Sequence, residues 1–261
     1  MPKSTDVPSE LKQFNKIFEH LAYRWESSTV FDDYLTYCIE VFNMDRTGER
    51  VRELQERYGE DYFDLVALFH EHLKVMEVMV AEDGVWYDLL GTFYESLRSN
   101  SKASRLGQFF TPQTICDFMA QITIDETMKG QGKRINDCAC GSGRTLLAAQ
   151  VIIPGNFLYG EDLDPMCAKM CAINMVMHGC VGQVCCMDTL MPDRWYFGYD
   201  INPELYSSTG RLGLRPVEKE RAFSYSSMQA RISHQPETKP EPVIKVGNTA
   251  QLNLFDQEEN Q

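Results

Sequence analysis

The 261-residue sequence predicts an α/β domain preceded by an all-α segment. Up to residue 98, apolar residues recur every three or four positions, which is the period of an amphipathic helix. After the polar stretch 99–106, short apolar runs alternate with helical segments, an order typical of a parallel sheet with right-handed crossovers. A glycine-containing turn, Cys140–Gly143, follows the first of these runs.

The N-terminal part divides into a polar leader, residues 1–10, and a helical domain, residues 11–98. Its aromatic residues recur at helical spacing and are expected to form a bundle core. Ser28 or Thr29 is the expected cap of the second helix. Residues 1–100 hold 20 acidic and 10 basic side chains, so this acidic domain is a possible binding surface for a protein partner. Helices are expected from Leu11 to Trp25, from Ser28 to Phe42, and over 50–58, 62–81 and 85–98.

The second domain is expected over residues 99–228. Its strands are predicted at 134–139, 156–160 and 181–187, with a possible fourth at 199–201, and its helices at 114–122, 144–152 and 165–178. The remaining residues, 229–261, are polar and are predicted to be a disordered tail. Val243–Val246 and Leu252–Phe255 are possible docking segments inside this tail, although an unstructured end is the simpler interpretation.

Charge and composition exclude several classes of protein. A net charge of −13 argues against a nonspecific nucleic-acid binder, which needs a basic face to neutralise phosphates. No apolar run approaches the roughly 18 residues that span a membrane, and residues 1–10 lack the apolar core of a signal peptide, so a cytoplasmic protein is expected. The nine cysteines are expected to be free thiols. Zinc at Cys138, Cys140, Cys185 and Cys186 is disfavoured, because neither C-x-C nor C-C has the usual ligand spacing, and no metal is expected.

Three features at successive strand ends predict a nucleotide-type cofactor pocket. Cys140–Gly143 joins a strand to a helix, where a glycine turn lets a ligand approach the backbone. Asp162 ends the second strand about 20 residues later, the distance expected for a carboxylate that accepts hydrogen bonds from a ribose diol. Asp188 ends the third strand and is a candidate acceptor for the amino group of an adenine ring.

The pocket favours a mononucleotide-type ligand over NAD. The dinucleotide motif G-x-G-x-x-G needs a third glycine, and Leu146 stands at that position. S-adenosylmethionine requires no pyrophosphate site, so it fits the pattern better and is the predicted cofactor.

Four segments resemble the modification subunits of type I restriction systems, which are N6-adenine DNA methyltransferases. They are W-Y-D-L-L-G through G-Q-F-F-T-P at 86–112, D-C-A-C-G-S-G at 137–143, G-E-D-L-D-P at 160–165, and N-M-V-M-H-G through M-D-T-L at 174–190. The resemblance implies a shortened Rossmann-like methyltransferase sheet after the helical domain. It implies that Phe110, Thr111 and Pro112 contact the methionine end of S-adenosylmethionine, that Ala139, Cys140, Gly141 and Gly143 line its methionine and ribose side, that Asp162 or the adjacent Glu161 binds the ribose, and that Asp188 binds the adenine.

The catalytic motif of that family, N-P-P-F or N-P-P-Y, is altered here to N-P-E-L at 202–205. In the family the Asn side chain and a Pro carbonyl accept the hydrogens of the adenine N6 amine, which localises its lone pair for methyl transfer. By resemblance Asn202 and Pro203 would do this, while Glu204 replaces the second Pro and Leu205 the aromatic residue that stacks on the flipped base. Members of that family need several more strands and a target-recognition region, so half of the usual sheet is expected to be missing or supplied by a partner.

Three functions therefore stay open. The first is a DNA adenine-N6 methyltransferase that works with a specificity or other partner subunit. The second is a catalytically impaired S-adenosylmethionine-binding module that acts through a partner protein. The third, more remote, is methyl transfer to RNA or protein. Five basic residues could contact DNA phosphates, although a solvated surface segment is an equally good interpretation: Arg211, Arg215, Lys219, Arg221 and Arg231.

Overall fold

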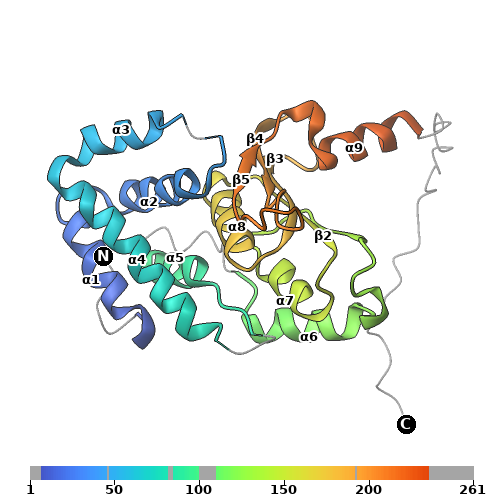
Figure 1. The fold of residues 1–261 in the computed structure, drawn as a ribbon, viewed down its shortest axis with the longest axis horizontal. Coiled ribbons are helices and arrows are strands. Elements are labelled where there is room, and N and C mark those ends of the chain that lie inside the picture. Colours follow the sequence, from blue (N-terminus) through green and yellow to red (C-terminus); the bar gives the residue numbers. More distant parts are fainter. Residues whose placement is uncertain (1–6, 46, 82–84, 100–109, 192, 235–261) are drawn as a thin grey trace, which may run out of the picture.

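The structure, a computed structural model, describes residues 7–45, 47–81, 85–99, 110–191 and 193–234. Figure 1 shows a helical part, α1 to α5, beside a second part in which a sheet is flanked by the later helices. Both parts of the predicted α/β fold are therefore present in the predicted order. No helix in the described ranges is both long enough and apolar enough to cross a membrane.

Within the described residues, five α-helices form the N-terminal part, as the apolar spacing predicts. Their bounds are Lys12–Ala22 (α1), Ser27–Phe42 (α2), Glu49–Tyr58 (α3), Tyr62–Met79 (α4) and Leu89–Ser99 (α5). The capping prediction for α2 was wrong, because the helix begins at Ser27 after Glu26, and no side chain caps it. Helix α5 begins four residues later than predicted, since the Asp88 carboxylate accepts the Gly91 N–H at 2.7 Å at its first turn. The predicted break at Asp83 and Gly84 lies outside the described residues.

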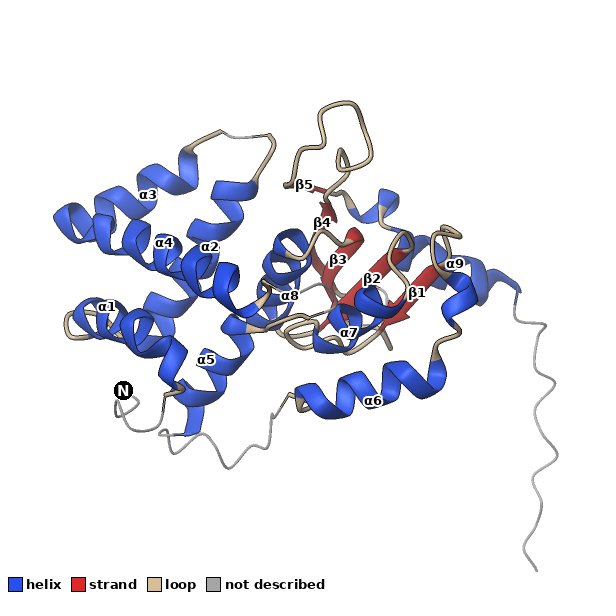
Figure 2. Ribbon diagram, turned by 60° about the horizontal axis from the view of Figure 1, so that its bottom comes forward, coloured by secondary structure: helices blue, strands red, loops and turns tan. Residues whose placement is uncertain are grey.

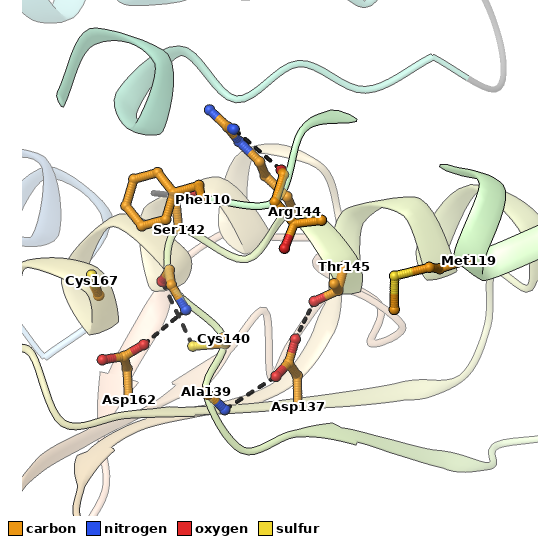
Figure 3. A pocket seen from close by; sticks show the side chains of 12 residues that line it. Phe110, Met119, Asp137, Ala139, Cys140, Ser142, Arg144, Thr145, Asp162 and Cys167 are labelled. Carbon is orange, nitrogen blue, oxygen red and sulfur yellow. Dashed lines mark hydrogen bonds between the residues drawn. The ribbon is translucent and has the colours of Figure 1, made fainter. Parts of the chain in front are cut away.

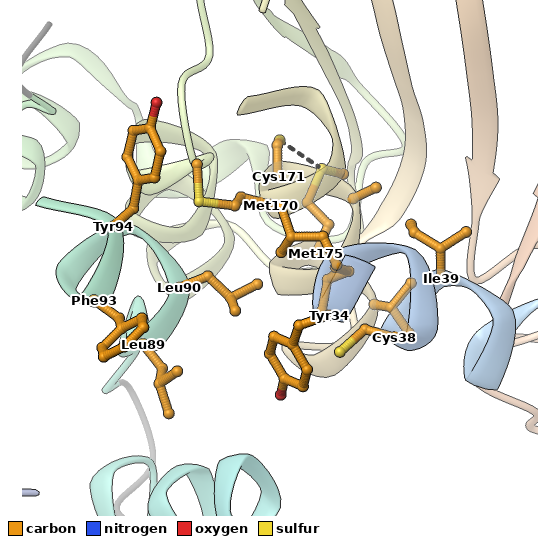
Figure 4. Packing of buried hydrophobic residues seen from close by; sticks show 14 of the residues in the cluster. Tyr34, Cys38, Ile39, Leu89, Leu90, Phe93, Tyr94, Met170, Cys171 and Met175 are labelled. Carbon is orange, nitrogen blue, oxygen red and sulfur yellow. Dashed lines mark hydrogen bonds between the residues drawn. The ribbon is translucent and has the colours of Figure 1, made fainter. Parts of the chain in front are cut away.

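Aromatic side chains fill the core of the helical part, as predicted. The rings of Phe14 and Phe18 each meet that of Phe93 edge to face, with centroids 4.9 Å apart, and Tyr34 packs against Phe14. Such edge-to-face pairs add to the stabilisation that apolar burial itself provides. Figure 4 shows that the packing continues from α2 and α5 onto Met170, Cys171 and Met175 of α8. One continuous cluster of buried side chains therefore joins the helical part to the sheet.

The described part of the chain forms a sheet of five strands in the order β1-β2-β3-β4-β5. Strands β1 (Arg134–Asp137), β2 (Phe157–Asp162) and β3 (Val181–Met187) are parallel, as predicted. The fourth strand, β4, runs over Trp195–Ile201, and both β4 and β5 (Leu214–Pro216) are antiparallel to their neighbours. The segment between β3 and β4 is too short for a crossover, which takes a dozen or more residues, so the chain turns back as a hairpin.

Helices cover both faces of the parallel strands. The helices α7 (Arg144–Ile152) and α8 (Pro165–Met177) pack on one face, and α6 (Gln113–Thr123) lies beside α7 (Figure 2). On the other face, Phe223 of α9 (Phe223–His234) packs its ring on that of Tyr159, with centroids 4.4 Å apart. The predicted tail starts too early, because residues 229–234 belong to α9. The rest of it, including both possible docking segments, lies outside the described residues.

Candidate cofactor site

A cavity of about 500 Å³ lies where β1 and β2 end and the glycine loop, Cys140–Gly143, begins (Figure 3). The carboxyl ends of parallel strands are the usual place for a ligand in an α/β sheet. Eight residues of the predicted motifs meet there, together with side chains from α6, α7 and α8. The lining residues are Phe110, Thr111, Met119, Asp137, Ala139, Cys140, Gly141, Ser142, Arg144, Thr145, Asp162 and Cys167.

The glycine loop owes its shape to Gly141. Its φ of +54° lies in the left-handed region that glycine adopts without strain. A Cβ atom at this position would stand 2.9 Å from the Phe110 ring, so the ring lies directly on the glycine. Gly143, the last residue before α7, shapes the turn but is not among the described residues that line the cavity. At Gly141 the loop therefore brings its backbone, rather than a side chain, to the wall of the cavity.

Asp162 is held at the cavity wall by the glycine loop. Its Oδ2 accepts the Gly141 N–H at 2.8 Å, and its Oδ1 accepts the Asp164 N–H at 2.9 Å. Burial raises the pKa of this carboxyl, while the two backbone donors act in the opposite direction. A carboxylate offers about four lone-pair sites, so two acceptor positions remain for a ligand such as a ribose diol.

Glu161, the alternative ribose residue, points to the opposite face of the sheet. Its carboxylate accepts the hydroxyl of Ser224 at the start of α9, and it is 2% exposed. Burial raises the pKa of Glu161, and the nearby Asp137 charge raises it further. Since successive side chains of a strand point to opposite faces, only one of the two acids can reach the cavity, and it is Asp162.

Phe110 and Thr111 line the cavity, whereas Pro112 is not among the described residues that line it. The Phe110 ring lies between Gly141 and the Tyr94 ring, and the Arg144 guanidinium lies 5.4 Å from its centroid. The Pro112 carbonyl accepts the Cys116 N–H at 3.0 Å and so closes the first turn of α6. Phe110 and Thr111 therefore form part of the cavity wall, while Pro112 supports the start of α6.

Asp188 ends β3, as predicted, but the turn that follows engages its side chain. Its Oδ1 accepts the N–H groups of Leu190 and Met191 at 3.0 and 3.1 Å, and its Oδ2 lies 3.6 Å from Arg194 Nη1. It is not among the described residues that line the cavity. The structure therefore does not bring the predicted adenine acceptor into the cavity wall.

Asn202 and Pro203 lie at the other end of the sheet. In the β3–β4 hairpin Ile201 pairs with Gly182, near the start of β3, while the cavity lies at the ends where Asp137 and Asp162 stand. Gly182 and Met187 are five residues apart, so about 17 Å of strand separates the two ends. The predicted catalytic pair is therefore not brought to the cavity, because β4 runs antiparallel to the strands that carry the cofactor residues.

The Asn202 side chain also has a local role. Its Nδ2 donates to the carbonyls of Val176 and Cys180 at 3.1 and 2.8 Å, and its Oδ1 accepts the Gly213 N–H at 2.9 Å. It has a φ of +48° and is 1% exposed, a backbone conformation for which Asn is among the better-tolerated residues. In this arrangement Asn202 joins the end of α8 to the loop before β5, and its polar atoms are engaged by the backbone.

Asp137 is the main cavity residue to which the motif analysis gave no role. Its Oδ1 accepts the Ala139 N–H at 3.1 Å, and its Oδ2 accepts the Thr145 hydroxyl. The signal was present, since Asp137 opens the quoted D-C-A-C-G-S-G motif and ends the first strand. Ser142 and Arg144 were also missed, because their shared partner Asp88, just before α5, lies more than 50 residues away in the sequence.

All nine cysteines are free thiols, as expected. Burial raises the pKa of Cys186 to about 12 and raises that of Cys185 as well, and the adjacent Cys171 together with burial raises that of Cys140. Zinc binds thiolates, so these thiols are poor metal ligands.

Among the basic residues considered for DNA contact, Arg215 and Lys219 have acidic partners within the described part of the chain. Arg215 lies 3.2 Å from carboxylate oxygens of both Glu204 and Asp45, and the Lys219 ammonium lies 4.0 Å from Asp193 Oδ1. Such pairs reduce the positive charge available to phosphates. The pairing favours the interpretation of these two residues as part of a solvated surface.

Comparison with known sequences shows what the segment around the cavity is similar to. Residues 85–202 match the family model for N-6 DNA methylases, so the resemblance predicted from the motifs is confirmed over this segment. The match begins just before α5 and ends at Asn202, and it contains all the strands and loops that line the cavity.

The relatives are methylase subunits of type I restriction enzymes. The chain is 30% identical over 99 residues to the MpnII subunit of Mycoplasma pneumoniae, a match that covers 35% of this chain and 18% of that subunit. It is 32% identical over 102 residues to the HindI subunit of Haemophilus influenzae (35% and 22%), and 30% identical over 105 residues to the EcoEI subunit of Escherichia coli (35% and 21%). The chain thus spans about a fifth of the length of these relatives.

A solved structure of a type I restriction-modification methyltransferase subunit from Streptococcus thermophilus is also similar. The match covers 66% of this chain and 42% of that subunit, at 20% identity and a TM-score of 0.34.

Proposed function

We propose that the cavity at the ends of β1 and β2 binds S-adenosylmethionine, and that the chain is a cofactor-binding module for methylation of DNA adenine at N6. The observation that carries this proposal is the Asp162 carboxylate, which the Gly141 N–H holds at the wall of a cavity of about 500 Å³. That volume lies within the usual range of small-molecule sites.

The cavity walls fit the two ends of this cofactor. Asp162 keeps acceptor positions for a ribose diol, and Phe110 with Thr111 forms an opposite wall from the G-Q-F-F-T-P segment. Leu146, at the third-glycine position, is buried with its Cδ1 3.1 Å from where a Cβ on Gly160 would stand. Helix α7 can carry this large side chain close to β2 only because Gly160 has no side chain. In the dinucleotide pattern the glycine that allows this close packing stands on the helix instead, so the arrangement favours S-adenosylmethionine over NAD.

The position of Asn202 favours a module whose methyl transfer depends on a partner. Transfer to N6 needs acceptors for the amine hydrogens next to the methyl group, and Asn202 is engaged by backbone groups at the far end of β3. We propose that a specificity subunit or another partner completes the side of the site that faces DNA, and that the cytoplasm is where the module works. Stand-alone methylation by Asn202 and Pro203 is the competing function.

Two measurements test these proposals. Titration calorimetry of the full chain with S-adenosylmethionine should give saturable binding that NAD does not compete for, and the absence of binding would refute the cofactor proposal. Transfer of a tritiated methyl group to unmethylated DNA should be absent for the chain alone. Transfer by the chain alone that is lost in Asn202→Ala would instead establish the stand-alone enzyme and overturn the partner requirement.

A further inference from the structure

A buried carboxylate on the helical part holds the glycine loop of the cavity. Asp88, at the start of α5, is 2% exposed and does not line the cavity. Its Oδ2 accepts a hydrogen bond from the Ser142 hydroxyl, on the glycine loop, at 2.5 Å. The same oxygen accepts one from Arg144 Nε, on the first residue of α7, at 2.7 Å. Its Oδ1 accepts the Gly91 N–H and the Asn174 Nδ2, each at 2.7 Å. Four donors from three segments therefore converge on one carboxylate.

The close approach of α5 to the loop depends on Gly91. A Cβ atom at this position would stand 2.0 Å from Asp88 Oδ2 and 2.6 Å from Ser142 Oγ, distances that no side chain can occupy. The helix backbone thus comes against the glycine loop itself. Asn174 of α8 strengthens the junction, because its Nδ2 also donates to the Ser142 carbonyl at 2.9 Å.

Arg144 extends the same junction to the opposite wall of the cavity. Its Nη2 donates to Glu95 Oε2 at 2.9 Å and its Nη1 to the Thr111 carbonyl at 3.3 Å. Glu95 Oε1 accepts the Phe110 N–H at 3.2 Å. Burial disfavours the charged guanidinium, but Asp88 and Glu95 outweigh it and raise the pKa of Arg144. One helix, α5, therefore fixes both the glycine loop and the Phe110–Thr111 segment.

We propose that Asp88 is a positioning residue for the cofactor site, which acts through Ser142 and Arg144 and makes cofactor affinity depend on the helical part. This inference rests on the proposed function for its ligand, S-adenosylmethionine. A carboxylate is required at this position because both oxygens accept two donors. In Asp88→Asn the amide NH₂ would face either Arg144 Nε or the Gly91 N–H, so one donor would oppose another.

Asp33 provides a matched control for the effects of burial. It is also a buried carboxylate, 7% exposed, and it accepts hydrogen bonds from Arg57 Nη1 and the Tyr58 hydroxyl, entirely within the helical part. Asp33→Asn should therefore destabilise the chain without disturbing the glycine loop. Ser142→Ala removes only one of the bonds to Asp88 and serves if Asp88→Asn does not fold.

The test measures binding and loop order in the same variants. Calorimetry with S-adenosylmethionine should show affinity about tenfold weaker in Asp88→Asn, equivalent to about 1.4 kcal/mol, and unchanged in Asp33→Asn. Ser142→Ala should be weakened by less, and the double variant should be no weaker than Asp88→Asn alone, because the Ser142 hydroxyl acts on the loop through its bond to Asp88.

Hydrogen exchange of the free proteins provides a readout without ligand. Amides of residues 138–147 should exchange faster in Asp88→Asn than in Asp33→Asn, even where the two have equal unfolding free energies. Equal exchange in this segment would overturn the positioning role, whether or not the cofactor binds. If wild type fails to bind S-adenosylmethionine while exchange still differs, the proposed cofactor is wrong and the positioning role stands.

Discussion

Exchange of Asp162 for Asn should weaken S-adenosylmethionine binding far more than the same change at its neighbour Glu161. The two acids are adjacent in sequence but lie on opposite faces of β2. Asp162 lines the cavity, whereas Glu161 is buried against Ser224 of α9. The matched pair Asp162→Asn and Glu161→Gln therefore changes one carboxylate at the site and one away from it.

The expected magnitude follows from the hydrogen bonds at Asp162. A hydrogen bond to a charged group contributes about 1.5–3 kcal/mol, so loss of one ribose contact should cost about 2 kcal/mol, or about 30-fold in affinity. Asn at this position also cannot accept from both backbone donors. Its NH₂ would face the N–H of either Gly141 or Asp164, which would loosen the glycine loop as well.

Titration calorimetry on the full chain measures the effect, with urea unfolding to confirm that each variant is folded. Glu161→Gln should bind as wild type does. It should also be more stable than wild type at neutral pH, because the folded state raises the pKa of Glu161 and so disfavours its charged form. A 30-fold loss in Glu161→Gln with little change in Asp162→Asn would refute the assignment of the ribose residue.

Three further predictions concern the loop, the altered motif and pH. Gly141→Ala should weaken cofactor binding about tenfold, because the new Cβ would stand 2.9 Å from the Phe110 ring and displace it. Unchanged affinity in calorimetry would contradict the role given to the packing of Phe110 on Gly141. Asn202→Ala should lower the free energy of unfolding by about 3 kcal/mol, since it removes three buried hydrogen bonds and leaves a left-handed Ala. Cofactor affinity should stay as in wild type, and a stable variant that lost affinity would place Asn202 at the site. Burial lowers the pKa of His72 to about 3, and the charge of His178 lowers it further. Between pH 6.5 and 3 the unfolded chain therefore binds a proton at His72 that the folded chain does not. The free energy of unfolding should therefore fall by about 1.4 kcal/mol per pH unit as the pH drops from 6.5 toward 3. In His72→Phe the urea midpoint should fall less steeply with pH over this range than it does in wild type.

The parallel strands and the residues that end them could be predicted from the sequence, because each follows from a local pattern. Asp162 ends an apolar run at a fixed distance from the glycines, and Gly141 lies in a turn between strand and helix. Their meeting at one cavity then follows from parallel pairing alone.

The direction of β4 and the surroundings of single side chains could not be predicted in the same way. The N-P motif after Asp188 indicated a catalytic loop, but the hairpin carries Asn202 to the far end of β3. Asp188 was placed correctly at the end of its strand, yet its carboxylate bonds to the turn that follows. Asp88 lies in the W-Y-D-L-L-G segment, but its role could not be predicted, because its partners on the glycine loop and α7 are more than 50 residues away.

The central claim is that the cavity between the glycine loop and the Phe110–Thr111 segment binds S-adenosylmethionine. Ultraviolet cross-linking of methyl-labelled S-adenosylmethionine to the full chain, followed by peptide mapping, tests it most directly. The label should appear in the peptides that contain Phe110 or residues 137–145, and unlabelled cofactor should compete it away. Competable label on another segment, or no competable label at all, would contradict the claim.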